Sequence, residues 1–352
     1  MIFRDRRFRV ISLTCLLAMA GTTAAAAQDR RALADLSEGS RVTAHDVVRL
    51  SFAGLDLAPD ALARVFRLPG GGWGVSAGVF RGVIQRFDRD GAPAGTFGRS
   101  GEGPGELGGQ VFGVPMDDEL WIVDPRNGRL SVFAEDLSHV GDRPLPGRVF
   151  SVAPAAGGRG LLISGFMYGG GSGETRGVAR ISLDEGADAF GGPIEDDPNP
   201  RVQIHMAAET PAGEVWTVAV SGGAVDILKS DDLSLLERLR LPGEELAQVA
   251  PTRGNLSEDR PAPQLAGITA DSTGLLWIAI AVADREWAPG LDPDDGAAKV
   301  YDTRILAVDP AERAVIGKVR LDDLCLPVEG RIVSCVDELG EAIRLVTLAI
   351  ER

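Results

Sequence analysis

Residue types that build most catalytic centres are scarce in this chain. Of its 352 residues, three are histidine, three are cysteine and 5% are aromatic. The histidines, at positions 45, 139 and 205, stand apart from the cysteines, so no cluster has the spacing of a zinc site. The sequence therefore offers no self-evident metal or catalytic constellation, and its function has to be inferred from its fold.

Lysine is scarcer still for a chain of this length and occurs only at Lys229, Lys299 and Lys318. Acidic residues outnumber basic ones by 51 to 36, which gives a formal net charge of −15. Such a chain repels the phosphates of nucleic acids and the headgroups of anionic lipids. We therefore expect no nucleic-acid partner and no electrostatic attachment to a membrane.

The apolar run 10–20 is too short for a permanent membrane span, which needs roughly 20 residues. It follows four arginines and precedes a row of small residues that ends in Ala25-Ala26-Ala27, an order typical of a secretory signal peptide. A lipid anchor at Cys15 is disfavoured, because this cysteine lies inside the apolar run. We expect 1–27 to be a signal peptide, 28–42 an N-terminal linker and 43–352 the domain, exported to the periplasm or secreted by a bacterium.

Glycine and proline are abundant, at 45 and 21 residues, and both weaken helix interiors. A short apolar strand, often with a tryptophan near its start, recurs six times. The anchors of the six copies are Trp73, Trp121, Leu162, Trp216, Trp277 and Ile332. Further β-prone runs and turn formers follow, at intervals that fit the roughly 40–50 residues of a propeller blade plus loop insertions. The sequence thus predicts an all-β, six-bladed β-propeller with its tryptophans packed between blades.

The last repeat ends one strand short, because only two residues follow the β-prone run 342–350. A second run near the other end of the chain, 46–52, can supply the missing strand. Joining the two would close the ring and hide its sheet edges. We therefore predict that an N-terminal strand completes the last blade.

Two cysteines remain after residues 1–27 are set aside, and an even number in an oxidising compartment indicates a disulfide. Cys325 and Cys335 flank a segment centred on Gly330, a residue suited to a turn. In a hairpin about this glycine the two cysteines face each other across the strands, at a separation that a disulfide can bridge. We predict this bridge; a pair of buried free thiols is the alternative.

Two stretches resemble NHL-repeat six-bladed propellers of the bacterial exported type. Residues 97–107, reading FGRSGEGPGEL, resemble the linker between blades, and residues 120–133, reading LWIVDPRNGRLSVF, resemble a strand-turn-strand unit. Asp124, Asn127 and Arg129 stand where that repeat often has the same residue types. The resemblance implies the fold and hardly any activity, since propellers serve as binding modules, scaffolds and enzymes.

Two residues are candidates for ligand contact. Trp287 lies outside the repeat, in the insertion 282–303, where an aromatic side chain on an irregular loop suits a ligand. His205 lies in a β-prone run that we place near the channel, although a structural histidine is the simpler interpretation.

The same insertion carries three carboxylates, Asp292, Asp294 and Asp295. Clustered carboxylates can hold calcium, which takes roughly six to eight oxygen ligands. The spacing departs from an EF-hand loop, because the glycine falls fifth and the twelfth position is Thr303. We predict no cofactor and keep calcium as an alternative.

These observations favour an exported, non-enzymatic binding or scaffold propeller with a protein, peptide or glycan ligand on one face. The alternative is a metal-dependent hydrolase or lyase, similar to lactonases, with its site at the central channel. A cluster of carboxylates at the channel would discriminate between the two, and sequence alone does not show which side chains meet there.

Overall fold

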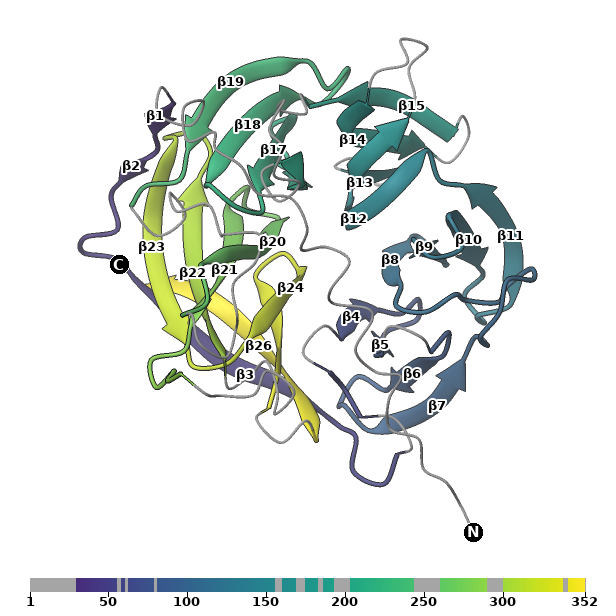
Figure 1. Ribbon diagram of the computed structural model, residues 1–352. Coiled ribbons are helices and arrows are strands. Elements are labelled where there is room, and N and C mark those ends of the chain that lie inside the picture. Colours follow the sequence, from purple (N-terminus) through teal and green to yellow (C-terminus); the bar gives the residue numbers. More distant parts are fainter. Residues whose placement is uncertain are drawn as a thin grey trace.

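The computed structural model describes residues 30–55, 58–60, 63–78, 81–155, 160–168, 175–182, 186–192, 203–243, 260–289, 300–337 and 341–351. They form a six-bladed β-propeller, as predicted, with no α-helix among the described elements. Figure 1 shows the six small sheets in a ring around a central opening. None of the described residues belongs to an apolar helix long enough to cross a bilayer.

Each blade is an antiparallel sheet of four strands, counted here from the channel outward. The first three blades are β4–β7 (Arg64–Arg67, Trp73–Ser76, Ile84–Phe87, Pro93–Phe97), β8–β11 (Phe112–Met116, Glu119–Asp124, Arg129–Phe133, His139–Pro144) and β12–β15 (Gly147–Pro154, Gly160–Tyr168, Thr175–Ser182, Gly186–Gly191). The next two are β16–β19 (His205–Glu209, Glu214–Ala219, Ala224–Lys229, Leu235–Arg240) and β20–β23 (Gln264–Ala270, Leu276–Ala283, Tyr301–Asp309, Ala314–Leu321). The sixth is β24, β25, β26 and β3 (Cys325–Glu329, Ile332–Val336, Ala342–Glu351, Arg41–Ser51).

The predicted repeat is confirmed in register. All six anchor residues lie on the second strand of a blade, in β5, β9, β13, β17, β21 and β25. The four anchor tryptophans are buried, with at most 3% of their surface exposed. Trp121, Trp216 and Trp277 pack against the following blade, whereas Trp73 packs against the preceding one, the sixth. All four tryptophans therefore lie between neighbouring sheets, as predicted, but Trp73 is on the opposite face of its blade.

The ring closes as predicted. β3, from the N-terminal part of the chain, pairs antiparallel with β26 and is the outermost strand of the sixth blade. The match runs from Ser51 opposite Ala342 to Arg41 opposite Glu351. Each end of the chain thus shields the sheet edge of the other.

Residues 30–36 form a second attachment, which we call the N-terminal clasp. The stretch assigned to a linker contains two short strands, β1 (Arg31–Ala32) and β2 (Ala34–Asp35). β1 pairs parallel with β19 and β2 pairs parallel with β23, the outer strands of adjacent blades. Figure 1 shows the clasp running along the outside of these blades before it reaches β3.

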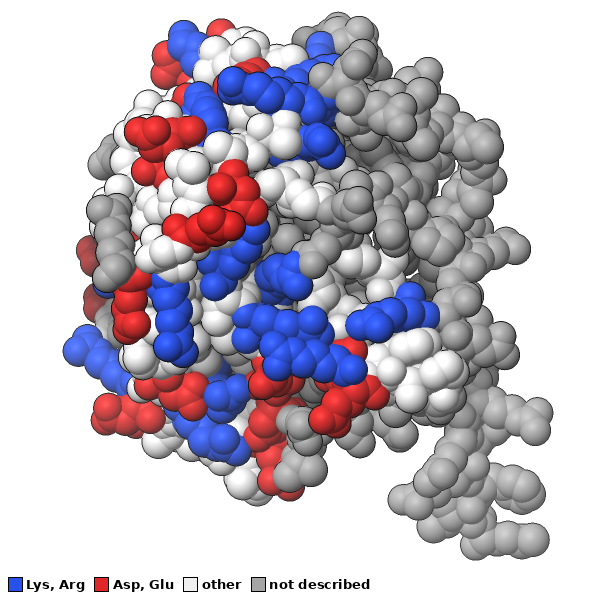
Figure 2. Space-filling model, turned by 90° about the vertical axis from the view of Figure 1, so that its left-hand side faces the viewer, with Lys and Arg blue, Asp and Glu red and all other residues white. Residues whose placement is uncertain are grey.

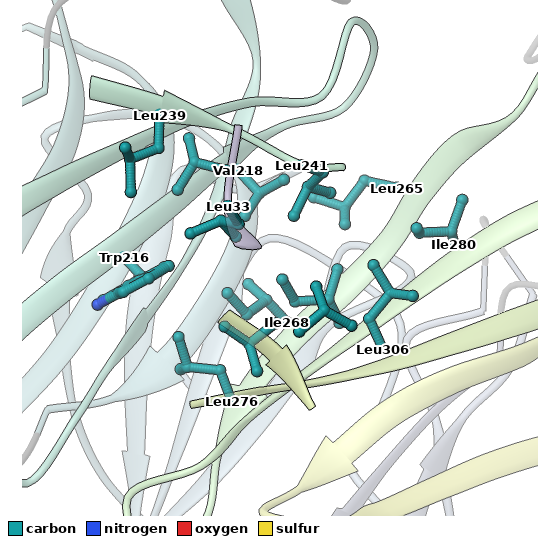
Figure 3. Packing of buried hydrophobic residues seen from close by; sticks show 14 of the residues in the cluster. Leu33, Trp216, Val218, Leu239, Leu241, Leu265, Ile268, Leu276, Ile280 and Leu306 are labelled. Atoms are coloured by element: carbon teal, nitrogen blue, oxygen red, sulfur yellow. The ribbon is translucent and has the colours of Figure 1, made fainter. Parts of the chain in front are cut away.

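Leu33 lies between β1 and β2 and anchors the clasp in the core. Its side chain is 3% exposed and belongs to a cluster that includes Trp216, Leu241 and Leu265. Figure 3 shows Leu33 among these side chains, which come from two blades. Burying a leucine side chain contributes about 1.5–3 kcal/mol, so this one residue helps to hold the two blades together.

Arg30 adds a buried ion pair. Its Nη1 lies 2.8 Å from Oδ1 of Asp226, and the two side chains are 5% and 0% exposed. Burial raises the pKa of Asp226, and the positive charges of Arg30 and Arg238 only partly oppose this effect. The second carboxylate oxygen, Oδ2, is buried without a hydrogen-bond partner in the part of the chain described. Asp226 therefore depends on Arg30 for most of its compensation.

The predicted disulfide is present. Cys325 on β24 lies directly opposite Cys335 on β25, and a bond joins their sulfur atoms. The hairpin turns at Gly330, whose positive φ of 48° suits glycine. A bridge that closes a loop of this size stabilises the fold by about 2–3 kcal/mol in the chain-entropy account.

The glycine-rich stretch 98–109 is a connection between blades. Asn127 Nδ2 donates a hydrogen bond to the carbonyl of Gly101 at 2.8 Å, and Arg129 binds the carbonyls of Glu102, Gly103 and Glu106. Asp124 caps the turn of the second blade through the backbone amides of residues 126 and 127, and its Oδ2 accepts a hydrogen bond from the Gly108 amide at 2.7 Å. The three polar residues of the NHL-like unit thus fix the connection that precedes them.

Acidic and basic side chains lie side by side on the outer rim near the clasp (Figure 2). Arg31 pairs with Glu237 at 2.9 Å and Arg313 pairs with the same glutamate at 3.1 Å. Exposed pairs of this kind contribute little individually. They show that Arg31 and Arg313 neutralise part of the acidic surface at this rim.

Candidate binding site in the central channel

The channel holds a pocket of about 320 Å³ built by all six blades. Its walls are the inner strands β4, β8, β12, β16, β20 and β24, one from each sheet. Figure 1 shows five of these six strands labelled around the central opening. Six lining residues represent the six walls: Arg64, Phe112, Phe150, Met206, Ile268 and Val328. Because every blade contributes, the pocket exists only in the closed ring.

Most of the lining residues are apolar. Phe150, Met206 and Ile268 come from three different blades. The lining also includes Phe66, Pro327 and several valines. Gly113 lines the pocket for a steric reason, because a Cβ there would come within 2.3 Å of the Phe66 ring. Glycine at this position lets the aromatic ring of β4 pack against β8. The pocket is thus shaped by packed rings and by backbone.

Three charged side chains line the pocket. Two of them neutralise each other, because Arg67 Nε lies 2.7 Å from Oε1 of Glu329. The guanidinium of Arg67 also lies 3.5 Å from the centre of the Trp73 ring, a cation–π contact. Arg67 is therefore held by a carboxylate and a ring, and its charge is already compensated.

Arg64 is the third charged residue and is differently placed. Its guanidinium carbon lies 5.1 Å from the centre of the Phe112 ring. Burial lowers the pKa of Arg64 to about 10, and the charge of Asp60, which is not part of the lining, partly opposes this effect. Within the described residues the Nε of Arg64 is buried without a hydrogen-bond partner. The pocket therefore carries one positive charge that its own lining does not neutralise.

The structure does not bring the two predicted ligand contacts into the pocket. His205 begins β16 and is buried, but its Nδ1 lies 3.2 Å from the Thr217 hydroxyl, and its neighbour Met206 lines the channel instead. Trp287 follows β21 at the end where that strand pairs with the start of β20. It is half-buried, and it is not part of the lining.

The weak calcium candidates Asp292, Asp294 and Asp295 lie outside the described residues. No group of three or more histidine, cysteine, aspartate or glutamate side chains is placed to hold a metal ion within the ranges described. Among the lining residues that the structure describes, Glu329 is the single carboxylate.

Ser76, in the first blade, lies in a sequence pattern that some hydrolases use for a catalytic serine. Residues 74–78 read G-V-S-A-G, which matches the G-x-S-x-G form of a nucleophile elbow. Ser76 is the last residue of β5, is fully buried, and its hydroxyl accepts a hydrogen bond from the Val111 amide at 3.0 Å. An elbow exposes its serine at a strand-to-helix turn, so this serine is structural.

A second hollow, of about 250 Å³, lies on the rim between β23, β26 and β3. Its charged residues are satisfied by one another. Arg344 lies 3.0 Å from Asp46 and also pairs with Asp323, while Arg320 pairs with the buried Asp302. These pairs occupy most of the charged groups of the hollow, whereas Arg64 in the channel has no ionic partner within the described lining.

Comparison with known proteins identifies the fold and no family. No family model matches the chain, and no curated protein matches its sequence. A solved structure of a DUF4221 family member from Bacteroides vulgatus has a TM-score of 0.60 at 12% identity, covering 89% of this chain and 99% of that one. A predicted exported protein from Bacteroides fragilis has a TM-score of 0.53 at 10% identity, with coverage of 92% and 98%.

An enzyme is among the similar structures as well. A luciferin-regenerating enzyme has a TM-score of 0.50 at 12% identity and covers 86% of this chain and 95% of its own. At such identities the likeness shows a propeller fold alone. The resemblance to NHL repeats accordingly stays a prediction drawn from residues 97–107 and 120–133.

Sequence reasoning missed Arg64 and the aromatic wall. Arg64 opens a four-residue strand and matches no motif, and arginine is the common cation throughout this chain. The special position of Arg64 is evident only in the folded structure, where six strands that are far apart in the sequence converge on the channel.

Proposed function

We propose that this propeller is a binding protein whose ligand occupies the central channel. The observation that carries the proposal is the apolar pocket enclosed by all six inner strands, with a few polar groups directed into it. Ligand sites of proteins are typically mainly apolar cavities of about 300–1,000 Å³ with a small number of polar anchors. The volume of about 320 Å³ suits a small ligand or the end of a larger one.

Export to the periplasm or beyond the cell is part of the same proposal. The bond between Cys325 and Cys335 supports it, because disulfides persist mainly in oxidising compartments. The N-terminal signal-like segment supports it independently. An NHL-type propeller that presents a ligand or partner site on one face remains the finer assignment that we favour.

The proposal predicts that filling the channel abolishes binding. Ser151 lines the pocket and is half-buried, so a Ser151→Trp side chain would occupy the space of a ligand. The probe is phenylnaphthylamine, an uncharged two-ring compound with a phenyl group. We expect the wild-type chain to bind one equivalent in equilibrium dialysis, and the variant to bind about tenfold more weakly or worse.

Val140→Trp is the matched control, since Val140 is 60% exposed on the outer strand of the second blade. It adds the same side chain far from the channel and should bind the probe as the wild type does. Circular dichroism would establish that both variants are folded. A wild-type chain without stoichiometric binding, or a Ser151→Trp variant that binds normally, would refute a channel site.

The metal-dependent hydrolase or lyase is tested by the metal content of chain purified without chelators. One calcium or zinc ion held per chain would favour the enzyme. A metal-free chain that gains no thermal stability from added ions would favour the binding protein.

A further inference from the structure

We propose that the channel ligand is a small organic anion, whose acid group pairs with Arg64 while its apolar or aromatic body lies against Phe112, Phe150 and Ile268. This inference rests on the proposed function and specifies the ligand class for that site. A carboxylate, sulfonate or phosphate ester would each supply the required chemistry.

The charge balance of the pocket is the first argument. Arg67 and Glu329 cancel at 2.7 Å, so among the described lining residues the net charge is that of Arg64 alone. Arg64 is half-buried, and a charge that is partly removed from water is costly unless a partner compensates it. The shift of the Arg64 pKa reflects this cost, since burial disfavours the charged form. An anion entering the pocket would restore the missing compensation.

The chemistry of guanidinium is the second argument. Its planar fork of donors matches the two oxygens of a carboxylate or sulfonate, and it can pair while resting on an aromatic face. Here the group lies over Phe112 and keeps its Nε without a partner among the described residues. A lysine would present only a point charge, so the residue type itself favours a planar or multi-oxygen acid.

The position of the two arginines gives the ligand a direction. They are the first and last residues of β4 and are therefore separated by about 10 Å along the channel, at roughly 3.3 Å per residue. The pair of Arg67 with Glu329 lies at the end of β4 and β24, and Arg64, which has no ionic partner within the described lining, lies at the start of β4. The acid group is thus expected at the Arg64 end, with the apolar body reaching inward between the rings.

The experiment compares two probes that differ by one acid group. Anilinonaphthalene sulfonate carries the same rings as phenylnaphthylamine plus a sulfonate. A hydrogen bond to a charged group contributes about 1.5–3 kcal/mol, which corresponds to about tenfold or more in affinity. We expect the wild-type chain to prefer the sulfonate by that factor. Arg64→Met should reduce the ratio of the two affinities, sulfonate to neutral probe, to less than about twofold.

The outcomes separate the two proposals. Binding of the neutral probe without preference for the sulfonate would overturn the anion assignment and leave the channel site standing. Binding of neither probe to the wild-type chain would refute the channel site itself. An unchanged sulfonate preference in Arg64→Met would also overturn the role of Arg64.

A measurement on the wild-type chain covers the case in which Arg64→Met does not fold. Benzoate should displace the bound sulfonate, whereas benzyl alcohol, of the same size without the charge, should do so about tenfold less well. Equal displacement by the two compounds would contradict the proposal.

Discussion

Replacing Arg30 with methionine is expected to lower the free energy of unfolding by about 3 kcal/mol at neutral pH, the lower end of the range for breaking a buried ion pair. The change leaves Asp226 buried with Arg238, 3.8 Å away and half exposed, as its remaining cation among the described pairs. Chemical denaturation of the purified chain followed by tryptophan fluorescence measures the effect. A decrease below about 1 kcal/mol would place the clasp among ordinary surface contacts.

The expected pH dependence follows from the direction of the Asp226 shift. Burial raises its folded-state pKa above the unfolded value, so the contribution of this group is fully present below the unfolded pKa and is lost as pH rises through the folded pKa. Without Arg30 the folded pKa rises further. The deficit of Arg30→Met relative to wild type should therefore narrow as the pH is lowered from 7 towards 4.

Two further variants isolate the buried charge. Arg31→Met is the matched control, because Arg31 is the next residue, its side chain is 70% exposed, and its pair with Glu237 lies on the surface. It should change stability by less than about 0.5 kcal/mol. Adding Asp226→Asn to Arg30→Met should recover part of the loss, since the uncompensated charge is removed.

Trp216→Ala is expected to destabilise the propeller by about 4 kcal/mol, within the range measured for removing a large aromatic side chain from a core. Trp216 is fully buried in the cluster that joins the fourth and fifth blades. Its Nε1 donates to Glu214 at 3.0 Å, and the guanidinium of Arg313 lies 5.3 Å from its ring. Denaturant midpoints, with the slope checked for two-state behaviour, measure the loss.

Trp216→Phe separates packing from the hydrogen bond. A phenyl ring keeps much of the apolar contact and loses the indole N–H together with one ring of the bicyclic system, so we expect a cost of about 1–2 kcal/mol. Glu214 keeps its two contacts with Arg313, at 2.6 and 2.8 Å, and is not left unpaired. A phenylalanine variant as unstable as the alanine variant would mean that the hydrogen bond, and not packing, is the main contribution.

The fold could be predicted because its determinants recur. Each blade repeats a strand that begins near a tryptophan, and repetition makes a weak signal readable even where Leu162 or Ile332 replaces the tryptophan. The closing strand β3 and the disulfide were predictable for a similar reason. The last repeat is one strand short, which predicts the closing strand, and the number of cysteines after residues 1–27 is even, which predicts the disulfide.

The clasp and the site could not be predicted in this way. β1 and β2 are two residues long, and they form because two sheet edges lie beside them. Likewise, Arg64 is set apart from the other arginines only by what surrounds it in the channel. Trp287 is half-buried and is not part of the described channel lining, so its role as a ligand contact stays a prediction.

The most direct test of the central claim is a crystal structure of the chain soaked with iodobenzoate, an aromatic acid whose iodine is located by its anomalous scattering. We expect an iodine peak inside the channel between Phe112, Phe150 and Ile268, with the carboxylate density at the guanidinium of Arg64. Iodine bound only outside the channel, or a carboxylate directed away from Arg64, would contradict it.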